Sequence, residues 1–219
     1  MGILFVGGIG VGKWLKKYME IEYLEKTLEN RELFLGKPED WPDKNDGELI
    51  QIYKVKKKLV DIRVTCLTMG PDRFHFWKIF GKGNLGVCLW FDKKELLLDI
   101  KTDQNLREGS VCYFTPTQLK KNCSIDGLPF AKREQYSDEK EFRVLREYDE
   151  QATGETQGIA FNPNSLKKIY FNSWLSKSEC DEKVEKIKSL KENCYKDVEI
   201  CQNKTLEFQE FINAAKCVK

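Results

Sequence analysis

The feature that most constrains the fold is a series of short apolar runs, several of them with the period-2 alternation of β-strands. The runs that we predict as strands occupy residues 32–36, 48–68, 85–91, 110–114, 141–145, 158–161, 168–171 and 197–202. Helical character is confined to the end of the stretch 14–30, to residues 74–80 and to the stretch 176–194. Strands and helices do not alternate regularly. The pattern therefore predicts an α+β fold, with a mixed, mostly antiparallel sheet of short strands and helices near the N-terminus and at the C-terminus.

Two polar segments are assigned by their composition. Residues 37–47, KPEDWPDKNDG, are rich in proline, aspartate and glycine, which is typical of a loop. The lysine-rich segment 54–58, KVKKK, lies inside the run 48–68. We expect its lysines on the exposed face of a strand or in a hairpin bend.

The length and composition favour one globular domain. The chain has 219 residues, of which 41% are hydrophobic and 33% charged, so it is too apolar to be disordered. It carries no internal repeat and no low-complexity linker. We expect a glycine-rich N-terminal segment over residues 1–13, followed by a single domain over residues 14–219 that includes an amphipathic helix from about residue 176.

Charge and hydropathy limit the partners that the chain can have. The formal net charge is +2, so no overall field attracts nucleic acid, and such a partner would need a local basic patch. The apolar stretch near residue 1 is shorter than the ~20 residues that span a bilayer, and it lacks the features of a signal peptide. We expect a cytoplasmic protein with no membrane partner, a nucleotide-like small molecule as substrate, and a protein partner as a further option. A nucleic acid partner is not expected, although the charge alone does not exclude one.

The eight cysteines resemble a disulfide framework only in number. They are scattered without a CxxC pair, and the chain contains one histidine. A chain of this length does not need disulfides to form a core. Cys66, Cys88 and Cys112 lie in apolar runs, where a free thiol packs as a small hydrophobe. The sequence predicts reduced structural cysteines and no zinc site.

Two glycine motifs imitate nucleotide-binding loops. Residues 7–13, GGIGVGK, read like a phosphate-binding loop, but Trp14 follows where a hydroxyl should bind magnesium. Residues 81–86, GKGNLG, match a dinucleotide fingerprint, yet they run from a helix into a strand, the reverse of the required order. We interpret the first as a glycine-rich turn and the second as a helix C-cap with a turn.

Five segments, in order, resemble the landmarks of a bacterial family, the domain-of-unknown-function family twenty-nine seventy-one. They are Lys17-Tyr18-Met19, WPDKNDGE at 41–48, VTCLT…FWKIFG…LGVCLWF within 64–91, DEKEFRVL at 138–145 and FNPNSLKKIYF at 161–171. The chain is identified as a member over residues 14–200. It departs from the family pattern at Met19, where arginine is usual, and at residues 44–47, which replace an Asn-Asp-Pro turn.

The segment Glu139-Lys140-Glu141 is the main candidate for chemistry. Inside a strand, its two carboxylates and Arg143 would share one face. The E-x-E pattern also resembles the catalytic motif of ADP-ribosyltransferases. That resemblance implies that Glu141 stabilises an oxocarbenium-like transition state and that Glu139 removes a proton from the acceptor. Arg143 would then orient a carboxylate or phosphate of the substrate.

Further substrate-binding residues follow from the same resemblance. Lys17 or Arg63 would supply the basic residue of an early strand, and Thr65 and Thr68 a Ser/Thr motif. Trp77, Phe80 and Tyr136 would stack on the nicotinamide or adenine ring. The substrate-binding residues that we expect are Lys17, Tyr18, Arg63, Thr65, Thr68, Trp77, Tyr136 and Arg143.

These resemblances predict an ADP-ribosyltransferase-like or NAD glycohydrolase-like bacterial protein, such as a toxin or a phage-defence effector, with NAD as its substrate and no metal. The alternative is a non-catalytic module that contacts a protein or nucleic acid through residues 176–194 and 54–58, because alternating charges on a strand are usually a solvated face. A third option is a magnesium-dependent nuclease with Asp43, Asp46 and Glu48 as its carboxylates.

Overall fold

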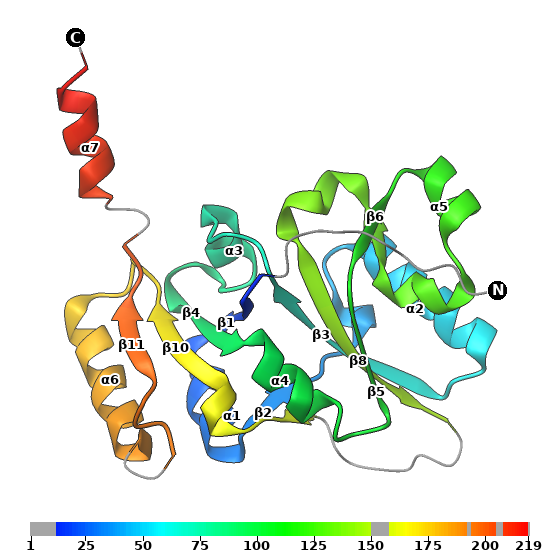
Figure 1. Cartoon of the computed structure of the whole chain (residues 1–219), viewed down its shortest axis with the longest axis horizontal. Helices are drawn as coiled ribbons and strands as arrows, with labels where there is room; N and C mark the ends of the chain where they lie inside the picture. The colour runs from blue at the N-terminus through cyan, green and yellow to red at the C-terminus, as the bar shows by residue number, and fades with distance from the viewer. Residues whose placement is uncertain (1–11, 150–157, 192–193, 205–207, 219) are drawn as a thin grey trace.

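A seven-stranded sheet organises the chain in the computed structural model, which describes residues 12–149, 158–191, 194–204 and 208–218 (Figure 1). Its strand order is β11-β10-β4-β1-β3-β8-β5, and every neighbouring pair is antiparallel except β10 and β11. The strands are β1 (Trp14–Glu20), β3 (Asp61–Thr68), β4 (Gly86–Asp92), β5 (Leu106–Ser110), β8 (Glu141–Tyr148), β10 (Leu166–Phe171) and β11 (Glu199–Gln202). The prediction of an α+β fold with a mostly antiparallel sheet is confirmed.

Two short strand pairs and seven α-helices complete the description of these residues. The pairs are β2 (Glu32–Phe34) with β9 (Gly158–Ala160), and β6 (Cys112–Phe114) with β7 (Ala131–Arg133). The helices are α1 (Leu24–Asn30), α2 (Lys44–Lys57), α3 (Phe74–Ile79), α4 (Lys93–Ile100), α5 (Pro116–Asn122), α6 (Lys177–Lys191) and α7 (Gln209–Lys216). The short 3-10 helices are η1 (Ile21–Tyr23), η2 (Pro38–Asp40), η3 (Gly83–Leu85), η4 (Ile125–Phe130), η5 (Glu134–Glu139) and η6 (Pro163–Ser165).

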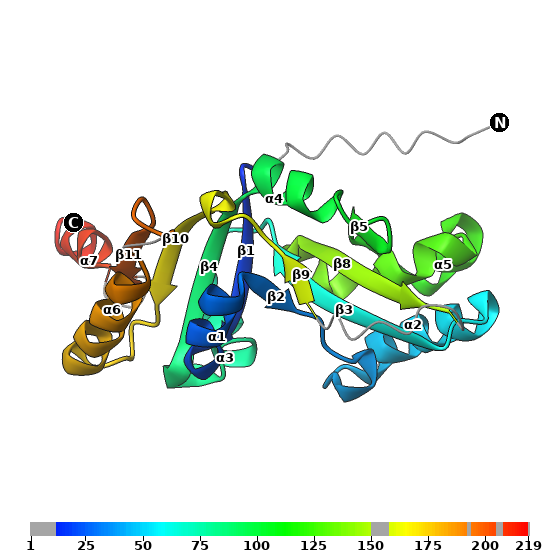
Figure 2. The ribbon, with the colours of Figure 1, turned by 90° about the horizontal axis from the view of Figure 1, so that it is seen from below.

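The sheet separates into two halves between β1 and β3. Strand β1 pairs with β4 over its whole length, but it pairs with β3 only where Lys16 faces Thr68. The two strands therefore run apart beyond that point (Figure 2). This split is the structural basis of the cleft described below.

The period-2 alternation of the strands distributes their side chains between cores on opposite faces. Leu67 of β3 packs in the largest cluster, which is completed by α1, α4 and α6. Val64 faces the other way, into a smaller cluster under α2. A third cluster, around Tyr18 and Cys88, lies under α3. Helices on both faces thus cover the two halves of the sheet.

The prediction of a strand over residues 48–68 was wrong for its first half. Residues 44–57 form α2, in which Asp46, Ile50 and Tyr53 are buried at the three- and four-residue spacing of a helix face. The side chain of Asp43 caps the helix by accepting from the Asn45 amide, and the KVKKK lysines form the last turn, where cations are favourable. The second half of the predicted strand is β3.

Two other predictions need correction. The stretch 14–30 is helical only in α1, because Trp14–Glu20 is a central strand of the sheet. Cys112 is exposed on β6 and is not part of the core, whereas Cys88 is fully buried. All eight cysteines are free thiols, as predicted.

Residues 1–11, which include most of the glycine-rich segment and of the loop-like motif 7–13, lie outside the described residues.

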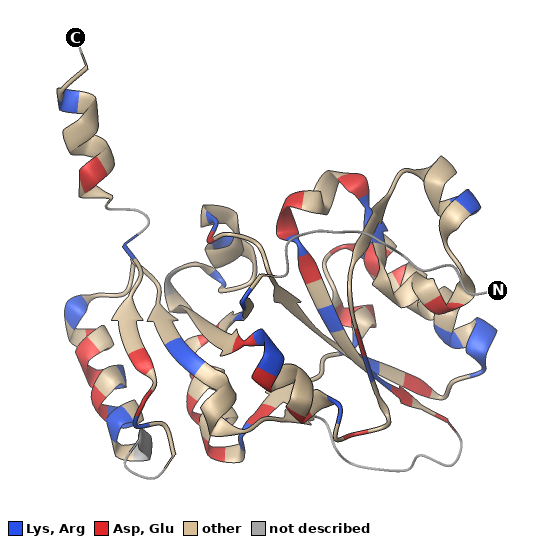
Figure 3. Ribbon diagram, viewed as in Figure 1, with Lys and Arg blue, Asp and Glu red and all other residues tan. Residues whose placement is uncertain are grey.

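Positive and negative side chains are interspersed along the ribbon, for example on α6 (Figure 3). This mixture agrees with the net charge of +2. None of the helices in the described ranges combines the length and the apolar character that a membrane span requires.

Candidate functional site

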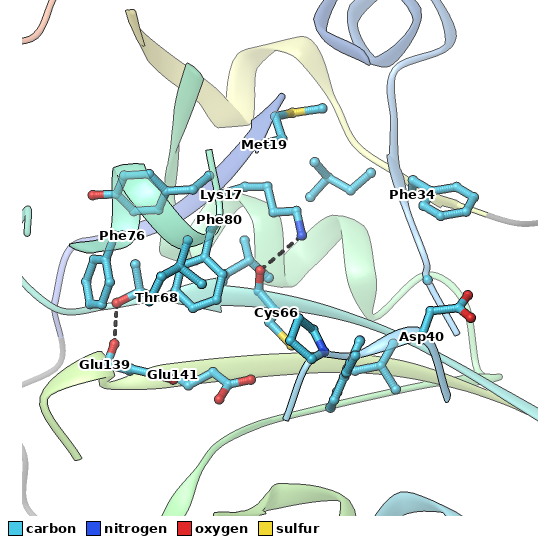
Figure 4. A pocket seen from close by; sticks show the side chains of 18 of the residues that line it. Lys17, Met19, Phe34, Asp40, Cys66, Thr68, Phe76, Phe80, Glu139 and Glu141 are labelled. Atoms are coloured by element: carbon cyan, nitrogen blue, oxygen red, sulfur yellow. Dashed lines mark hydrogen bonds between the residues drawn. The ribbon is translucent and has the colours of Figure 1, made fainter. Parts of the chain in front are cut away.

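A cleft with a volume of about 1670 Å³ enters the split between β1 and β3. Its walls come from both strands, from the segment 40–46 at the start of α2, from β2, from the end of α3 and from the segment 132–141 (Figure 4). Small-molecule sites usually measure about 300–1,000 Å³, so this cleft has room for a dinucleotide and for part of a second substrate.

Five charged side chains form a buried group at one end of the cleft, which we call the Lys132 cluster. It consists of Asp46, Lys132, Glu139, Glu141 and Arg143. The Lys132 ammonium lies 2.6 Å from Glu139 Oε2, 3.0 Å from Glu141 Oε2 and 3.1 Å from Asp46 Oδ2. The ammonium donates hydrogen bonds to Glu139 and Glu141 and forms an ion pair with Asp46. With three carboxylates and two cations, the cluster has one negative charge in excess when all its groups are ionised.

Arg143 binds the carboxylate of Glu141 but does not itself line the cleft. Its side chain is fully buried, and Nε donates to Glu141 Oε1 at 2.7 Å. Nη2 donates to Asp46 Oδ2 at 3.0 Å and Nη1 to the carbonyl oxygen of Pro129 at 2.9 Å. The guanidinium is therefore committed to protein partners. From the sequence we expected Arg143 to orient the substrate, whereas in the structure it fixes a carboxylate of the protein.

The two glutamates converge by a turn and not by strand alternation. Glu139 ends η5, Lys140 adopts the left-handed conformation with φ 44°, and Glu141 begins β8. The Thr68 hydroxyl donates to the carbonyl oxygen of Glu139, and the Glu141 amide donates to the Tyr113 hydroxyl at 2.8 Å. The strand predicted over the whole E-x-E segment was wrong, but both carboxylates meet at Lys132.

The surroundings of the two glutamates separate their pKa values. Burial acts to raise the pKa of Glu141, but the charges of Arg143 and Lys132 outweigh it and lower that pKa to about 2. Burial raises the pKa of Glu139, and the hydrogen bond from Lys132 only partly offsets this. Glu141 therefore stays ionised near neutral pH, and Glu139 is the carboxyl better placed to exchange a proton. A pair of carboxyls with separated pKa values is typical of acid–base sites.

Lys17 lies in the split, on the opposite side of the cleft from β8. Its Nζ donates to the carbonyl oxygen of Cys66 at 3.2 Å, and Figure 4 shows the side chain reaching from β1 toward β3. Burial lowers the pKa of Lys17, while the negative charge of Glu141 acts in the opposite direction. An ammonium has three donors, so Lys17 can bind an anionic group of a ligand in addition to Cys66.

Four other predicted residues also line the cleft. Thr68 and Tyr18 do so from β3 and β1, although the Tyr18 hydroxyl is engaged with Asp72 Oδ1 at 2.5 Å. Tyr136 lines the cleft next to the Lys132 cluster, with its ring centroid 4.9 Å from the Lys132 ammonium. Phe80 also lines the cleft, and the residue is 44% exposed.

Arg63, Thr65 and Trp77 do not line the cleft. The residues of β3 that line the cleft are Val64, Cys66, Leu67 and Thr68, and neither Arg63 nor Thr65 is among them. Arg63 pairs with Asp61 at 2.5 Å. Trp77 is buried in the third core cluster, where its indole N–H donates to Asp72 Oδ1 at 2.8 Å. For these three residues, the structure does not support contact with a substrate in the cleft.

The structure adds two residues that the sequence analysis did not assign to this site, Lys132 and Asp46. The sequence suggests Asp46 only as a carboxylate of a magnesium site together with Asp43 and Glu48. In the structure it pairs with two cations, and Asp43 pairs with Arg133 at 2.8 Å. Among the described residues, no group of three or more His, Cys, Asp or Glu side chains is placed to hold a metal ion.

The lowered pKa of Glu141 predicts a loss of stability in acid. The carboxyl titrates near pH 4.3 in an unfolded chain and at about 2 in the fold, so its ionisation favours the folded state above ~pH 4. This contribution disappears as the pH falls toward 2. We expect the urea midpoint to decrease between about pH 4.5 and pH 2.5. The decrease should be smaller in the Glu141→Gln variant, which has no carboxyl at this position, and parallel decreases in both proteins would contradict the assignment.

No family model matches this chain, so the resemblance to the domain-of-unknown-function family is not confirmed, and no curated protein matches it either. The chain is similar to the structure of Thermus sp. 2.9 DarT in complex with NAD+, at 9% identity and a TM-score of 0.47, over 89% of this chain and 96% of that chain. It is also similar to the structure of Thermus sp. 2.9 DarT in complex with ADP-ribosylated ssDNA, at 11% identity and a TM-score of 0.47, over 88% of this chain and 95% of that chain. For the structure of Thermus sp. 2.9 DarT in complex with carba-NAD+, the identity is 10% and the TM-score 0.43, over 90% of this chain and 98% of that chain. A likeness at this level carries no argument about the chemistry of this chain.

Proposed function

We propose that the chain is an enzyme that consumes NAD by ADP-ribosyl transfer or by hydrolysis, with the Lys132 cluster as its catalytic end. The observation that carries the proposal is the excess negative charge of this cluster, held in place at the end of a cleft of about 1670 Å³. A fixed negative charge stabilises a transition state in which positive charge develops on a ribose. The proposal rests on these groups and not on the likeness to the Thermus chains.

In the proposed reaction, the bond between the nicotinamide nitrogen and ribose C1′ breaks, and its electron pair leaves with neutral nicotinamide. Glu141, ionised throughout, stabilises the cationic ribose. The oxygen of water or of an acceptor hydroxyl then bonds to C1′, and its proton passes to Glu139, whose pKa is raised by burial. Lys17 binds an anionic group such as a phosphate, and Tyr136 or Phe80 stacks on a base. Toxin or phage-defence activity would follow from the consumption of NAD in a bacterium.

The non-catalytic alternative predicts that Glu139 and Glu141 are paired with lysines on an open surface. Both residues do pair with Lys132, but the Glu141 and Lys132 side chains are only 6% and 9% exposed. The pairs also lie at a concave site. This geometry favours the enzymatic proposal.

The test is to incubate the purified chain with NAD+ and to quantify nicotinamide and ADP-ribose by chromatography. We expect nicotinamide to be released, and we expect NAD+ to raise the melting temperature of the protein. The absence of both effects would overturn the proposal. Release of nicotinamide without free ADP-ribose would indicate transfer to an acceptor on the protein itself, which also supports it.

The Lys17→Gln variant should bind NAD+ less well, because a charge-assisted hydrogen bond to an anionic group is lost. At 1.5–3 kcal/mol for such a bond, we expect KM to rise by roughly ten- to a hundredfold, with a smaller change in kcat. Steady-state kinetics of nicotinamide release measure both constants. Lys94→Gln, a change of the same kind at an exposed position of α4, should leave them unaltered. An unchanged KM in Lys17→Gln would remove Lys17 from the binding site.

A further inference from the structure

Helix α7 presents its apolar side chains to solvent. Phe208, Phe211 and Ile212 are 56%, 68% and 49% exposed, and the helix projects from the rest of the domain (Figure 1). Together with Ala215, these residues recur at the three- and four-residue intervals of one helix face. A helix of eight residues is marginal in water without tertiary contacts. The face therefore lacks the packing that would stabilise the helix.

A second set of exposed apolar side chains lies on α3 and just after it, and we call it the α3 patch. It consists of Phe74, Ile79, Phe80 and Leu85, which are 52%, 59%, 44% and 53% exposed. Four large exposed apolar side chains within twelve residues of chain favour an interaction surface here. Ile79 and Phe80 also line the cleft.

The chain enters α7 from a point that is fixed beside the α3 patch. Asn203 Nδ2 donates to Asp72 Oδ2 at 2.6 Å, and the Ser173 hydroxyl donates to the carbonyl oxygen of Asn203 at 2.6 Å. Asp72 also accepts from the indole of Trp77, which belongs to α3. From Asn203 to Phe208, the chain can span at most on the order of 17 Å. Helix α7 is thus tethered within reach of the α3 patch of its own chain.

The charges beside the two apolar surfaces are complementary. Arg73 and Lys78 are exposed next to Phe74 and Ile79, whereas α7 carries Glu210 next to Phe211. Glu210 lies in the first turn of α7, the end that is closer to the tether at Asn203. Docking of α7 on the α3 patch would bring Glu210 close to Arg73 and Lys78. This attraction between opposite charges favours the α3 patch as the surface that α7 contacts.

We propose that α7 docks through the face of Phe208, Phe211 and Ile212 onto the α3 patch of the same chain. The docked helix covers Ile79 and Phe80 at one wall of the cleft, so α7 also limits access to it. This docking depends on the two surfaces alone and not on the consumption of NAD.

Hydrogen exchange of the full chain, read by mass spectrometry, tests this. If α7 docks, its amides should exchange at least about tenfold more slowly than an undocked eight-residue helix, which exchanges close to the rate of an unfolded peptide. Phe211→Asp in α7 and Ile79→Asp in the α3 patch should each abolish that protection. Val55→Asp serves as the matched control, because Val55 is a 75% exposed apolar residue on α2, away from the patch. Unchanged exchange of β4 and β8 verifies that each variant is folded.

Three results would overturn the proposal. The first is α7 amides that exchange at the unprotected rate in the wild-type chain. The second is protection that Ile79→Asp leaves unchanged, since the occupied surface would then lie elsewhere. The third is protection that increases with protein concentration, because this would assign the contact to a second copy of the chain.

Discussion

Replacement of Arg143 by methionine is expected to lower the free energy of unfolding by about 3–5 kcal/mol, a large part of the stability of a typical domain. Arg143 is fully buried and donates to Glu141 and Asp46, so methionine fills most of its volume but leaves two buried carboxylates with Lys132 as their remaining cation. For a domain of this size, such a loss corresponds to a melting temperature lower by roughly 6–20 °C. Urea denaturation and thermal unfolding near pH 7 measure both quantities.

The matched control is Arg133→Met. Arg133 also pairs with an aspartate, at 2.8 Å from Asp43, but its side chain is 43% exposed. Exposed pairs contribute about 0–1 kcal/mol, so this variant should remain close to the wild type. Equal costs for the two variants would mean that the Lys132 cluster is open to solvent. A smaller loss when Arg143→Met is combined with Glu141→Gln would show that the cost comes from uncompensated charge.

The strands and the sheet type could be predicted from the sequence because most strands are buried on at least one face. Runs such as residues 85–91 and 168–171 are apolar enough to identify β4 and β10. The N-terminal half of the run 48–68 was misassigned because Ile50 and Ile52 imitate alternation, although Ile52 is 37% exposed and the buried set is that of a helix. Short apolar runs fit both periodicities, and only the tertiary packing of α2 decides between them.

The candidate site could be predicted only in part. The E-x-E spacing pointed to Glu139 and Glu141 as the two carboxylates. The turn that brings them together depends on the left-handed conformation of Lys140, which the alternation of polar and apolar residues does not predict. Asp46 and Arg143 are 97 residues apart in the chain, so their contact leaves no local pattern in the sequence. Lys132 reaches the glutamates because β7 and η5 fold back beside β8, which is equally a property of the tertiary structure.

Glutamine in place of Glu141 is expected to reduce the rate of nicotinamide release by about 10²–10³-fold. The proposed reaction needs a negative charge beside the developing cation on ribose, and the amide keeps the shape of the carboxylate without its charge. Because the pKa of Glu141 is lowered to about 2, the wild-type charge is complete at the pH of the assay. The decrease should therefore be in kcat, with a small change in KM, as measured by steady-state kinetics at a temperature where thermal unfolding shows both proteins to be folded.

The Glu139→Gln variant separates the role of Glu139 from that of Glu141 in the Lys132 cluster. It should also slow the reaction, by about 10²-fold, because it removes the proton acceptor. In the wild type the rate should fall as the pH decreases through the raised pKa of Glu139, and this decline should be absent in Glu139→Gln but present in Glu141→Gln. Glu182→Gln on the exposed face of α6 is the control for a glutamate outside the cleft. If Glu141→Gln keeps more than about a tenth of the wild-type kcat, the charge of Glu141 does not stabilise the transition state, and the role proposed for the Lys132 cluster is wrong.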